Sequence, residues 1–199
     1  MSIPEASEPE QLQIAIKQNS DRLLRLIRGR LSVGLSRRID AEDVLQEALL
    51  NAATRWEKYT SDPQVSVYVW LRGIVMDRMV DLVRHHTAGM RSVGKEHTPE
   101  QFDSQSSLDF AKNLFVHYST PSESLMARES DEVVAASLEC ISDRHRNIIM
   151  MRFFEKLSVR EVAEVLSISV ANAKVIQFRA LKSFAEQVQT RLSSQTRQK

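Results

Sequence analysis

The sequence predicts an all-α protein made of two small helical domains that are joined by a flexible linker. Only five Gly and five Pro interrupt its 199 residues, which leaves few signals for the tight turns of a β-rich fold. Apolar residues recur at steps of three and four over residues 11–86 and again over about 123–189, a spacing typical of amphipathic helices. Residues 87–122 break this pattern with Gly, Pro and a Ser/Gln/Asp tract, which is typical of a linker.

The expected boundaries follow from this pattern. We expect an N-terminal extension over residues 1–20, a first domain over 21–88, a linker over 89–122, a second domain over 123–190 and a polar tail over 191–199. Apolar positions between 108 and 118 predict a short helix inside the linker. The polar tail is expected to fray from position 190 onward.

The charges are mixed rather than uniformly basic, with a formal net charge of +1. Residues 22–38 hold six Arg and no acid, whereas 123–140 is acidic. Such a distribution suits a protein that touches DNA with some faces and protein with others. The single cysteine, Cys140, excludes an internal disulfide and is expected to be buried on an apolar helix. Without a run of about 20 apolar residues or a secretion signal, the chain is expected in the cytoplasm.

In the first domain, a helix is expected to begin after Asp40, whose side chain can cap it. Acids in its first turn are favourable against the helix dipole. Asp43, Gln46 and Glu47 lie at i, i+3 and i+4, so they share one outward face. Such a face can bind a partner, and the alternative interpretation is a solvated acidic turn with no binding role. The core stripe of this helix is expected at Val44, Leu45, Ala48, Leu49 and Ala52.

An aromatic pair and a polar loop follow this helix. Trp56 and Tyr59 precede the polar residues 60–66, after which Trp70 begins a further apolar helix. Aromatic walls and hydrogen-bonding groups of this kind can hold an unstacked base of opened DNA. Core packing is the alternative reading for each aromatic residue taken singly, and Trp70 is expected to be mainly core.

The second domain ends in two short helices that are joined by a tight turn. Ser158 and Glu161 form a capping box for the first of them, and Ser169 is placed to cap the second. The second helix is expected to bury Val170, Ala173, Ile176, Ala180 and Phe184. Its opposite face carries Asn172, Lys174, Val175, Phe178, Arg179 and Lys182. This is the helix-turn-helix arrangement that reads DNA, although two packed helices with a solvated face would share its pattern.

Three segments carry a resemblance to a known family. Residues 141–166 resemble region 4 of sigma-70 transcription factors, with its "LR…G.S..EIA..L" pattern. Residues 40–50, DAEDVLQEALL, resemble region 2.2, and residues 56–78 resemble regions 2.3 and 2.4. No segment resembles regions 1.1 or 3, so the resemblance is to the smallest branch, the extracytoplasmic-function type. It implies two helical domains and a role in promoter recognition, promoter melting and transcription initiation.

The resemblance also implies which residues act. The resemblance assigns polymerase binding to Asp43, Gln46 and Glu47. It assigns contacts with −10 DNA to Tyr59, Thr60, Trp70, Arg72, Asp77, Arg78 and Arg84. Contacts with the −35 element fall on Arg152, Asn172, Lys174, Val175, Phe178 and Arg179. Asp77 stands where the family commonly has Asn, and Val175 and Ile176 stand where polar residues are frequent, which affects the promoter sequence more than the fold.

The implied partners are core RNA polymerase, through the clamp helices of its largest subunit and its flap, and promoter DNA; an anti-sigma factor is left open. We expect no cofactor, no metal and no enzymatic activity, because the five His and one Cys lack zinc-ligand spacing and no nucleophile or phosphate-loop motif is present. The rival reading is a helix-turn-helix repressor or activator with a helical dimerisation domain. Such a protein needs neither the acidic face nor the aromatic loop.

Overall fold

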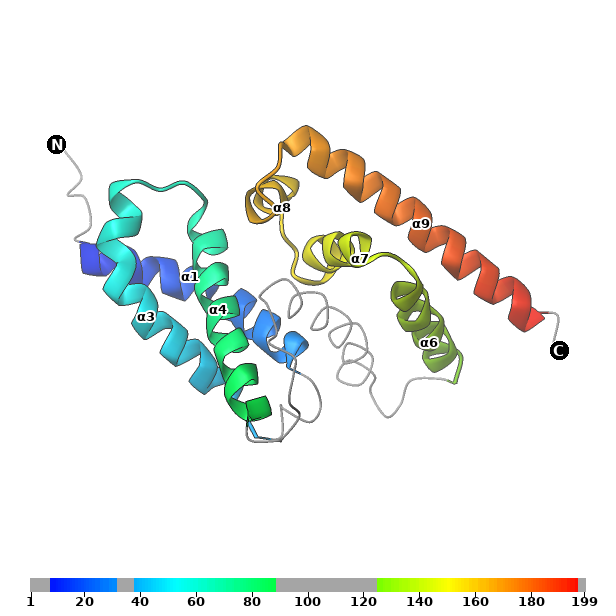
Figure 1. Ribbon diagram of the computed structural model, residues 1–199, viewed down its shortest axis with the longest axis horizontal. Helices are drawn as coiled ribbons and strands as arrows, with labels where there is room; N and C mark the ends of the chain where they lie inside the picture. The colour runs from blue at the N-terminus through cyan, green and yellow to red at the C-terminus, as the bar shows by residue number, and fades with distance from the viewer. Residues whose placement is uncertain (1–7, 32–37, 89–124, 197–199) are drawn as a thin grey trace. The chain divides into compact units, whose positions relative to one another are not determined.

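The computed structural model describes residues 8–31, 38–88 and 125–196 (Figure 1). All regular elements in these ranges are helices, which confirms the predicted all-α class. They are α1 (Glu8–Arg30), α3 (Ala41–Ser61), α4 (Val67–Ala88), α6 (Leu125–Cys140), α7 (Asp143–Ile149), the π-helical turn η1 (Met150–Phe154), α8 (Val159–Val165) and α9 (Val170–Thr196).

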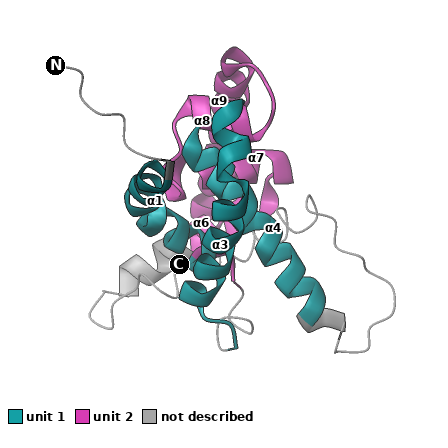
Figure 2. Cartoon of the chain, turned by 90° about the vertical axis from the view of Figure 1, so that its left-hand side faces the viewer, with its two compact units in different colours: residues 1–28, 36–99 teal, residues 29–35, 100–199 magenta. Residues whose placement is uncertain are grey.

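The chain forms two compact units, as predicted (Figure 2). The first comprises residues 1–28 and 36–99, and the second comprises 29–35 and 100–199. The helix expected over 108–118, and most of the expected linker, lie outside the described residues. Helix α1 begins at Glu8 and already buries Ala15, so part of the expected N-terminal extension is helical.

The centre of the first unit is the pair of helices α3 and α4, which lie side by side and are joined by a short loop at one end (Figure 1). The core stripe predicted for α3 is buried at Val44, Leu45, Ala48 and Ala52 and half-buried at Leu49. Further apolar side chains of this unit are buried on α1 and α4, among them Leu23, Leu26, Ile27, Leu71, Val75 and Met79.

Polar contacts fix the start of α3 and the position of α1. Asp40 caps α3 as predicted, accepting the Glu42 backbone N–H at 2.9 Å. Hydrogen bonding with the Glu42 side chain, and then with its backbone, lowers the pKa of Asp40. Glu42 also pairs with Arg28 of α1. Earlier in α1, the Arg22 guanidinium lies 3.6 Å above the Tyr68 ring of α4, a cation–π contact.

In the second unit, α9 packs against α6, α7 and α8. The core consists of apolar side chains from every one of these helices and from η1: Leu138, Ile148, Met150, Met151, Leu157, Val162, Ala163, Ala173, Ile176 and Ala180. Helix α9 continues to Thr196, beyond position 190 where fraying was expected. Arg191 explains this continuation, because it donates to the Ala136 carbonyl of α6 at 3.0 Å and so ties the end of α9 to the fold.

A buried arginine, Arg146, caps the C-terminal end of α6 with hydrogen bonds. Arg146 is buried, and its guanidinium donates to the carbonyls of Leu138, Glu139 and Ile141 while pairing with Asp143. These bonds satisfy carbonyls that the end of a helix leaves without intrahelical partners. The second unit contains another buried ion pair, in which Arg30 donates to Glu155 at 2.5 Å.

Candidate nucleic-acid interface

The helix-turn-helix is formed by α8, α9 and the turn between them. Ser158 accepts the Glu161 N–H at 3.1 Å, and the Glu161 carboxylate accepts the Ser158 N–H at 2.7 Å, which confirms the capping box. Ser169 accepts the Asn172 N–H at 3.2 Å and so caps α9, as predicted. The turn passes through Ser167 at a φ of 52°, a left-handed conformation. Local side-chain chemistry therefore sets where both helices begin.

The outer face of α9 carries the polar and apolar side chains expected of a recognition surface. All six residues predicted to face outward are exposed: Asn172, Lys174, Val175, Phe178, Arg179 and Lys182. Phe178 is 70% exposed and Val175 is 47% exposed, although both are apolar. One inward assignment was wrong, since Val170 is 42% exposed. Val170 is the first residue of α9, directly after the turn that joins it to α8.

Arg152 lies in η1 and reaches α9. Its Nε donates to the Gln177 side chain at 3.0 Å, and its Nη1 donates to the Leu157 carbonyl. Arg152 is half-buried, so part of its guanidinium is still accessible. These two bonds show that Arg152 fixes α9 against η1.

Three aromatic rings meet where α3 and α4 join. Tyr59 stacks on Trp70 with 4.5 Å between ring centroids, and Trp56 lies 5.6 Å from Tyr59 and 5.7 Å from Trp70. Trp56 is buried, and Tyr59 and Trp70 are half-buried. The Tyr59 hydroxyl donates to the Val65 carbonyl at 2.9 Å, so the ring also holds the loop. Trp56, which was not among the predicted site residues, forms the base of this stack.

Thr60 was expected in the loop but lies in the last turn of α3. Its hydroxyl donates to the carbonyls of Trp56 and Glu57, at 3.2 and 3.1 Å, and so stays within that helix. The backbone of the loop itself spans residues 62–66. Thr60 therefore sits at the edge of the aromatic stack, half-buried.

The predicted arginines of α4 differ in accessibility. Arg84 is exposed and lies 4.0 Å from Asp81. Arg78 pairs with Glu47 of α3, and its side chain is 33% exposed. Arg72 is buried, and this position does not fit the contact with −10 DNA expected for it. The Arg72 side chain therefore lies on the buried side of α4. The spacing of the apolar residues in the sequence did not reveal that Arg72 faces this side.

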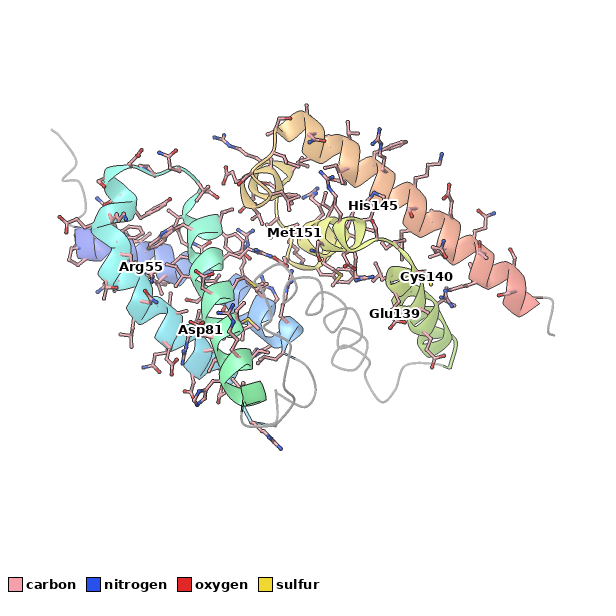
Figure 3. All side chains as sticks on the ribbon, viewed as in Figure 1. Arg55, Asp81, Glu139, Cys140, His145 and Met151 are labelled. Atoms are coloured by element: carbon pink, nitrogen blue, oxygen red, sulfur yellow. The ribbon has the colours of Figure 1, made fainter. Side chains whose placement is uncertain are left out.

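Asp77 lies in a polar pocket between α3 and α4 and not at the aromatic stack. The pocket has a volume of about 370 Å³, and its lining includes neither Tyr59 nor any residue of 60–66. Partial burial raises the pKa of Asp77, Arg55 of α3 opposes that rise, and Asp81 adds to it. The sequence pattern did not reveal Arg55, because its place in this pocket depends on how α3 and α4 face each other (Figure 3).

The acidic face of α3 is exposed at Asp43, Gln46 and Glu47, as predicted. Beside it lies an apolar hollow of about 370 Å³ between α1 and α3. Leu50, in the lining of this hollow, is 64% exposed. Acidic side chains next to an exposed apolar surface form a face suited to a basic, amphipathic protein partner.

Cys140 is exposed, so the prediction of a buried thiol was wrong. It is the last residue of α6, and its sulfur accepts from Arg191 Nη2 at 3.0 Å (Figure 3).

Within the described ranges, no group of three His, Cys, Asp or Glu side chains is placed to hold a metal ion. None of the helices described is both long and apolar enough to cross a membrane.

Comparison with known proteins assigns both units. Residues 15–88 match the family Sigma-70 region 2, and residues 137–184 match Sigma-70, region 4. The chain belongs to the sigma-70 family and is a sigma factor of transcription initiation. Within that family it is of the extracytoplasmic-function (ECF) type.

Two Bacillus subtilis relatives are of this type. The ECF RNA polymerase sigma factor SigM is 27% identical over 141 residues, which cover 70% of this chain and 74% of SigM. The ECF RNA polymerase sigma factor SigW is 20% identical over 149 residues, 75% of each chain. A solved structure of the sigma factor RpoE with the anti-sigma factor NepR from Bartonella quintana matches with 14% identity and a TM-score of 0.47, over 91% of this chain and 96% of that one.

Proposed function

We propose that this sigma factor binds core RNA polymerase through the acidic face of α3, places α9 on −35 duplex DNA and holds opened −10 DNA at the α3–α4 hairpin. One observation carries the proposal: a single helical hairpin has an exposed acidic face and, at its tip, an aromatic stack with an attached loop. A repressor that reads closed duplex has no need for either feature. The rival reading is therefore not retained.

For the −35 element, the proposed contacts come from the exposed face of α9. Asn172, Lys174 and Arg179 offer donors for base edges and phosphates. Val175 and Phe178 are exposed apolar side chains that suit thymine methyl groups. Arg152 supports this face through Gln177 and keeps part of its guanidinium accessible for a phosphate.

For the −10 element, the proposed platform is the stack of Tyr59 and Trp70 with Thr60 at its edge. A base that leaves the duplex loses its stacking, and an aromatic surface compensates for that loss. Arg78, Arg84 and Asp77 lie further along α4 and extend the surface toward the next nucleotides. We leave the buried Arg72 out of the DNA contacts and give it a structural role.

For the polymerase, the proposed docking surface comprises Asp43, Gln46 and Glu47 together with the exposed Leu50. The expected partner is the pair of clamp helices of the largest subunit, and the second unit is expected to contact the flap. An anti-sigma factor that inhibits this chain would have to cover this docking surface or the outer face of α9. Neither a cofactor nor a catalytic step enters this function.

The decisive experiment is transcription in vitro with purified core polymerase from the same bacterium. Promoter-dependent transcripts that require the added chain support the proposal, and permanganate reactivity of thymines around −10 reports the melted strand. A chain that binds duplex DNA yet neither associates with core nor opens any promoter would overturn it. A charge-reversal variant of Asp43 serves as the matched control, because it should abolish transcription without changing the fold.

A further inference from the structure

Gln177, on the recognition helix α9, accepts a hydrogen bond from Arg152. The Arg152 Nε donates to the side-chain oxygen of Gln177 at 3.0 Å, and the Arg152 Nη1 donates to the Leu157 carbonyl. Two bonds therefore hold the guanidinium against one side of α9. Gln177 itself is half-buried, and the contacts with the −35 element proposed above do not include it.

The chemistry of Arg152 fixes which end of the Gln177 amide faces it. An amide has a carbonyl oxygen, which accepts hydrogen bonds, and an NH2 group, which donates two hydrogens. A guanidinium has five donors and no acceptor, so the amide nitrogen could make no bond with it. The oxygen of Gln177 is therefore engaged by Arg152, and the nitrogen lies on the other branch of the planar amide. Side chains that are joined in this way also polarise one another, which strengthens the remaining donor.

The amide nitrogen of Gln177 has no acceptor among the residues that the structure describes. Its neighbours along the same side of α9 are Val170 and Lys174 before it and Leu181 after it, at i−7, i−3 and i+4. All three are exposed, so this side of the helix is open on either side of Gln177. Lys174 is also one of the residues proposed to contact the −35 element. The donor of Gln177 thus lies next to a proposed DNA contact.

A glutamine that can only donate distinguishes the bases differently from a free glutamine. In the major groove, guanine O6 and thymine O4 are keto oxygens that accept, whereas adenine N6 and cytosine N4 are amines that donate. A free glutamine binds adenine with two hydrogen bonds, in which its oxygen accepts from N6 and its nitrogen donates to N7. Gln177 cannot form this pair while Arg152 engages its oxygen. The donor that remains matches a keto oxygen and meets a second donor at an amine.

We infer that Gln177 is a further specificity-determining residue for the −35 element, and that its amide donates to the keto oxygen of a guanine or a thymine. Arg152 is the positioning residue, because it acts on the base through the orientation of the Gln177 amide. The inference rests on the proposed placement of α9 on −35 duplex DNA. It adds a preference for keto bases at one base pair and names the residue pair that sets it.

The test is a selection from duplex DNA with the full-length chain. The probe is a pool of duplexes with a randomised central stretch, and the bound fraction is separated by gel mobility shift and sequenced. The parent should select a motif in which one base pair favours guanine or thymine over adenine or cytosine by about fivefold, the effect of one hydrogen bond. The ratio of bases at that position is the measure, because a change of overall affinity alters every position alike.

Three variants locate this base pair and test its cause. Gln177→Leu removes both donor and acceptor, so the preference should disappear there while the rest of the motif stays. Gln177→Glu keeps an acceptor for Arg152 but has no donor, so the preference should turn toward adenine or cytosine. Arg152→Met leaves the amide free to turn, so adenine should be accepted at the same base pair. A purely structural role of Arg152 would weaken binding to all sequences without changing this preference.

Gln187→Leu is the matched control, because it makes the same change at a half-buried glutamine further along α9. Circular dichroism checks that each variant is folded. The inference is overturned if Gln177→Leu selects the same motif as Gln187→Leu and the parent. It is also overturned if a folded Arg152→Met variant keeps the parent's preference for keto bases. If Arg152→Met does not fold, the two Gln177 variants decide.

The proposed function is judged separately by transcription with core polymerase. A parent that supports transcription while its Gln177 variants select an unchanged motif would refute the inference and leave the function standing. A parent whose motif depends on Gln177 but that supports no transcription would refute the function and leave the role of Gln177 standing. A parent that selects no motif at all would overturn the inference together with the proposed −35 contacts.

Discussion

The rings of Tyr59 and Trp70 stack with 4.5 Å between their centroids and 21° between their planes. One face of the tyrosine ring is therefore covered by protein, and an unstacked base can approach only its other face or its edge. The Tyr59 hydroxyl is also engaged, because it donates to the Val65 carbonyl. The stack thus fixes the ring and the loop together before any DNA binds.

Tyr59→Ala should lower the yield of open complex on duplex promoters. Stacking of a base on an aromatic ring contributes roughly 1–3 kcal/mol, so the loss should be about tenfold. Permanganate footprinting with core polymerase measures it, and a pre-melted −10 bubble should partly rescue the variant. Tyr59→Phe keeps the ring and loses only the bond to Val65, so it should open promoters better than Tyr59→Ala. Equal footprints for parent and Tyr59→Ala would contradict the assignment.

Charge reversal of Asp43 and Glu47 to Lys should abolish co-purification with core polymerase. Both side chains are exposed, so the helix content seen by circular dichroism should not change. Glu57→Lys is the control for a single charge reversal, because it replaces an exposed acid by Lys on α3 outside the acidic face. If the double variant still co-purifies with core, the polymerase contact lies elsewhere.

Lys174→Ala and Arg179→Ala should each weaken binding to −35 duplex DNA, by roughly 1–3 kcal/mol where a base contact is lost. Both residues are exposed on the outer face of α9, so stability should stay close to that of the parent. Arg144→Ala, an exposed arginine on α7, controls for loss of one positive charge. An affinity drop no larger than that of Arg144→Ala would show that α9 has been misassigned as the reading helix.

Lys156→Gly should stabilise the second unit by about 1 kcal/mol, because Lys156 adopts a φ of 58° that glycine reaches without strain. The family pattern places Gly at this position, two residues before the capping Ser158. Lys156→Ala removes the same charge but keeps a Cβ, so it should give no gain. Urea denaturation compares the two variants. A gain for Ala equal to that for Gly would attribute the effect to charge instead of backbone strain.

Asp77→Asn should stabilise the first unit at neutral pH. Burial raises the pKa of Asp77, so folding disfavours its ionised form even with Arg55 nearby. This unfavourable contribution is complete above the folded-state pKa and disappears as the pH falls below the ordinary value, near 4. The advantage of the variant should therefore shrink as the pH is lowered toward 4 in urea denaturation. Glu132→Gln, exposed on α6, is the control, and an advantage independent of pH would contradict this account.

The caps and faces of the helices could be predicted because they depend on a few neighbouring residues. Ser158 with Glu161, Ser169 and Asp40 act within one turn, and the outer face of α9 follows from its periodicity. Val170 and Cys140 could not be placed in this way. Periodicity gives the direction of a side chain around its helix but not how far the neighbouring helix extends along it.

Features that depend on two helices at once were also beyond prediction. The pocket of Arg55 and Asp77 needs the register of α3 against α4, which no local pattern encodes. The polar end of α9 is helical because Arg191 finds carbonyl and thiol partners on α6, 51 to 55 residues earlier in the chain. Tertiary contacts of this kind override the composition of a segment.

The exposed thiol at the end of α6 has a practical consequence. Cys140 is the single cysteine of the chain, so a maleimide dye would attach at one known position without any engineered substitution. That position lies on the region 4 unit, on a helix that packs against α9 and away from its proposed DNA-reading face. A donor dye there and an acceptor on promoter DNA or on core polymerase would report, by energy transfer, when this unit engages and when it lets go during promoter escape.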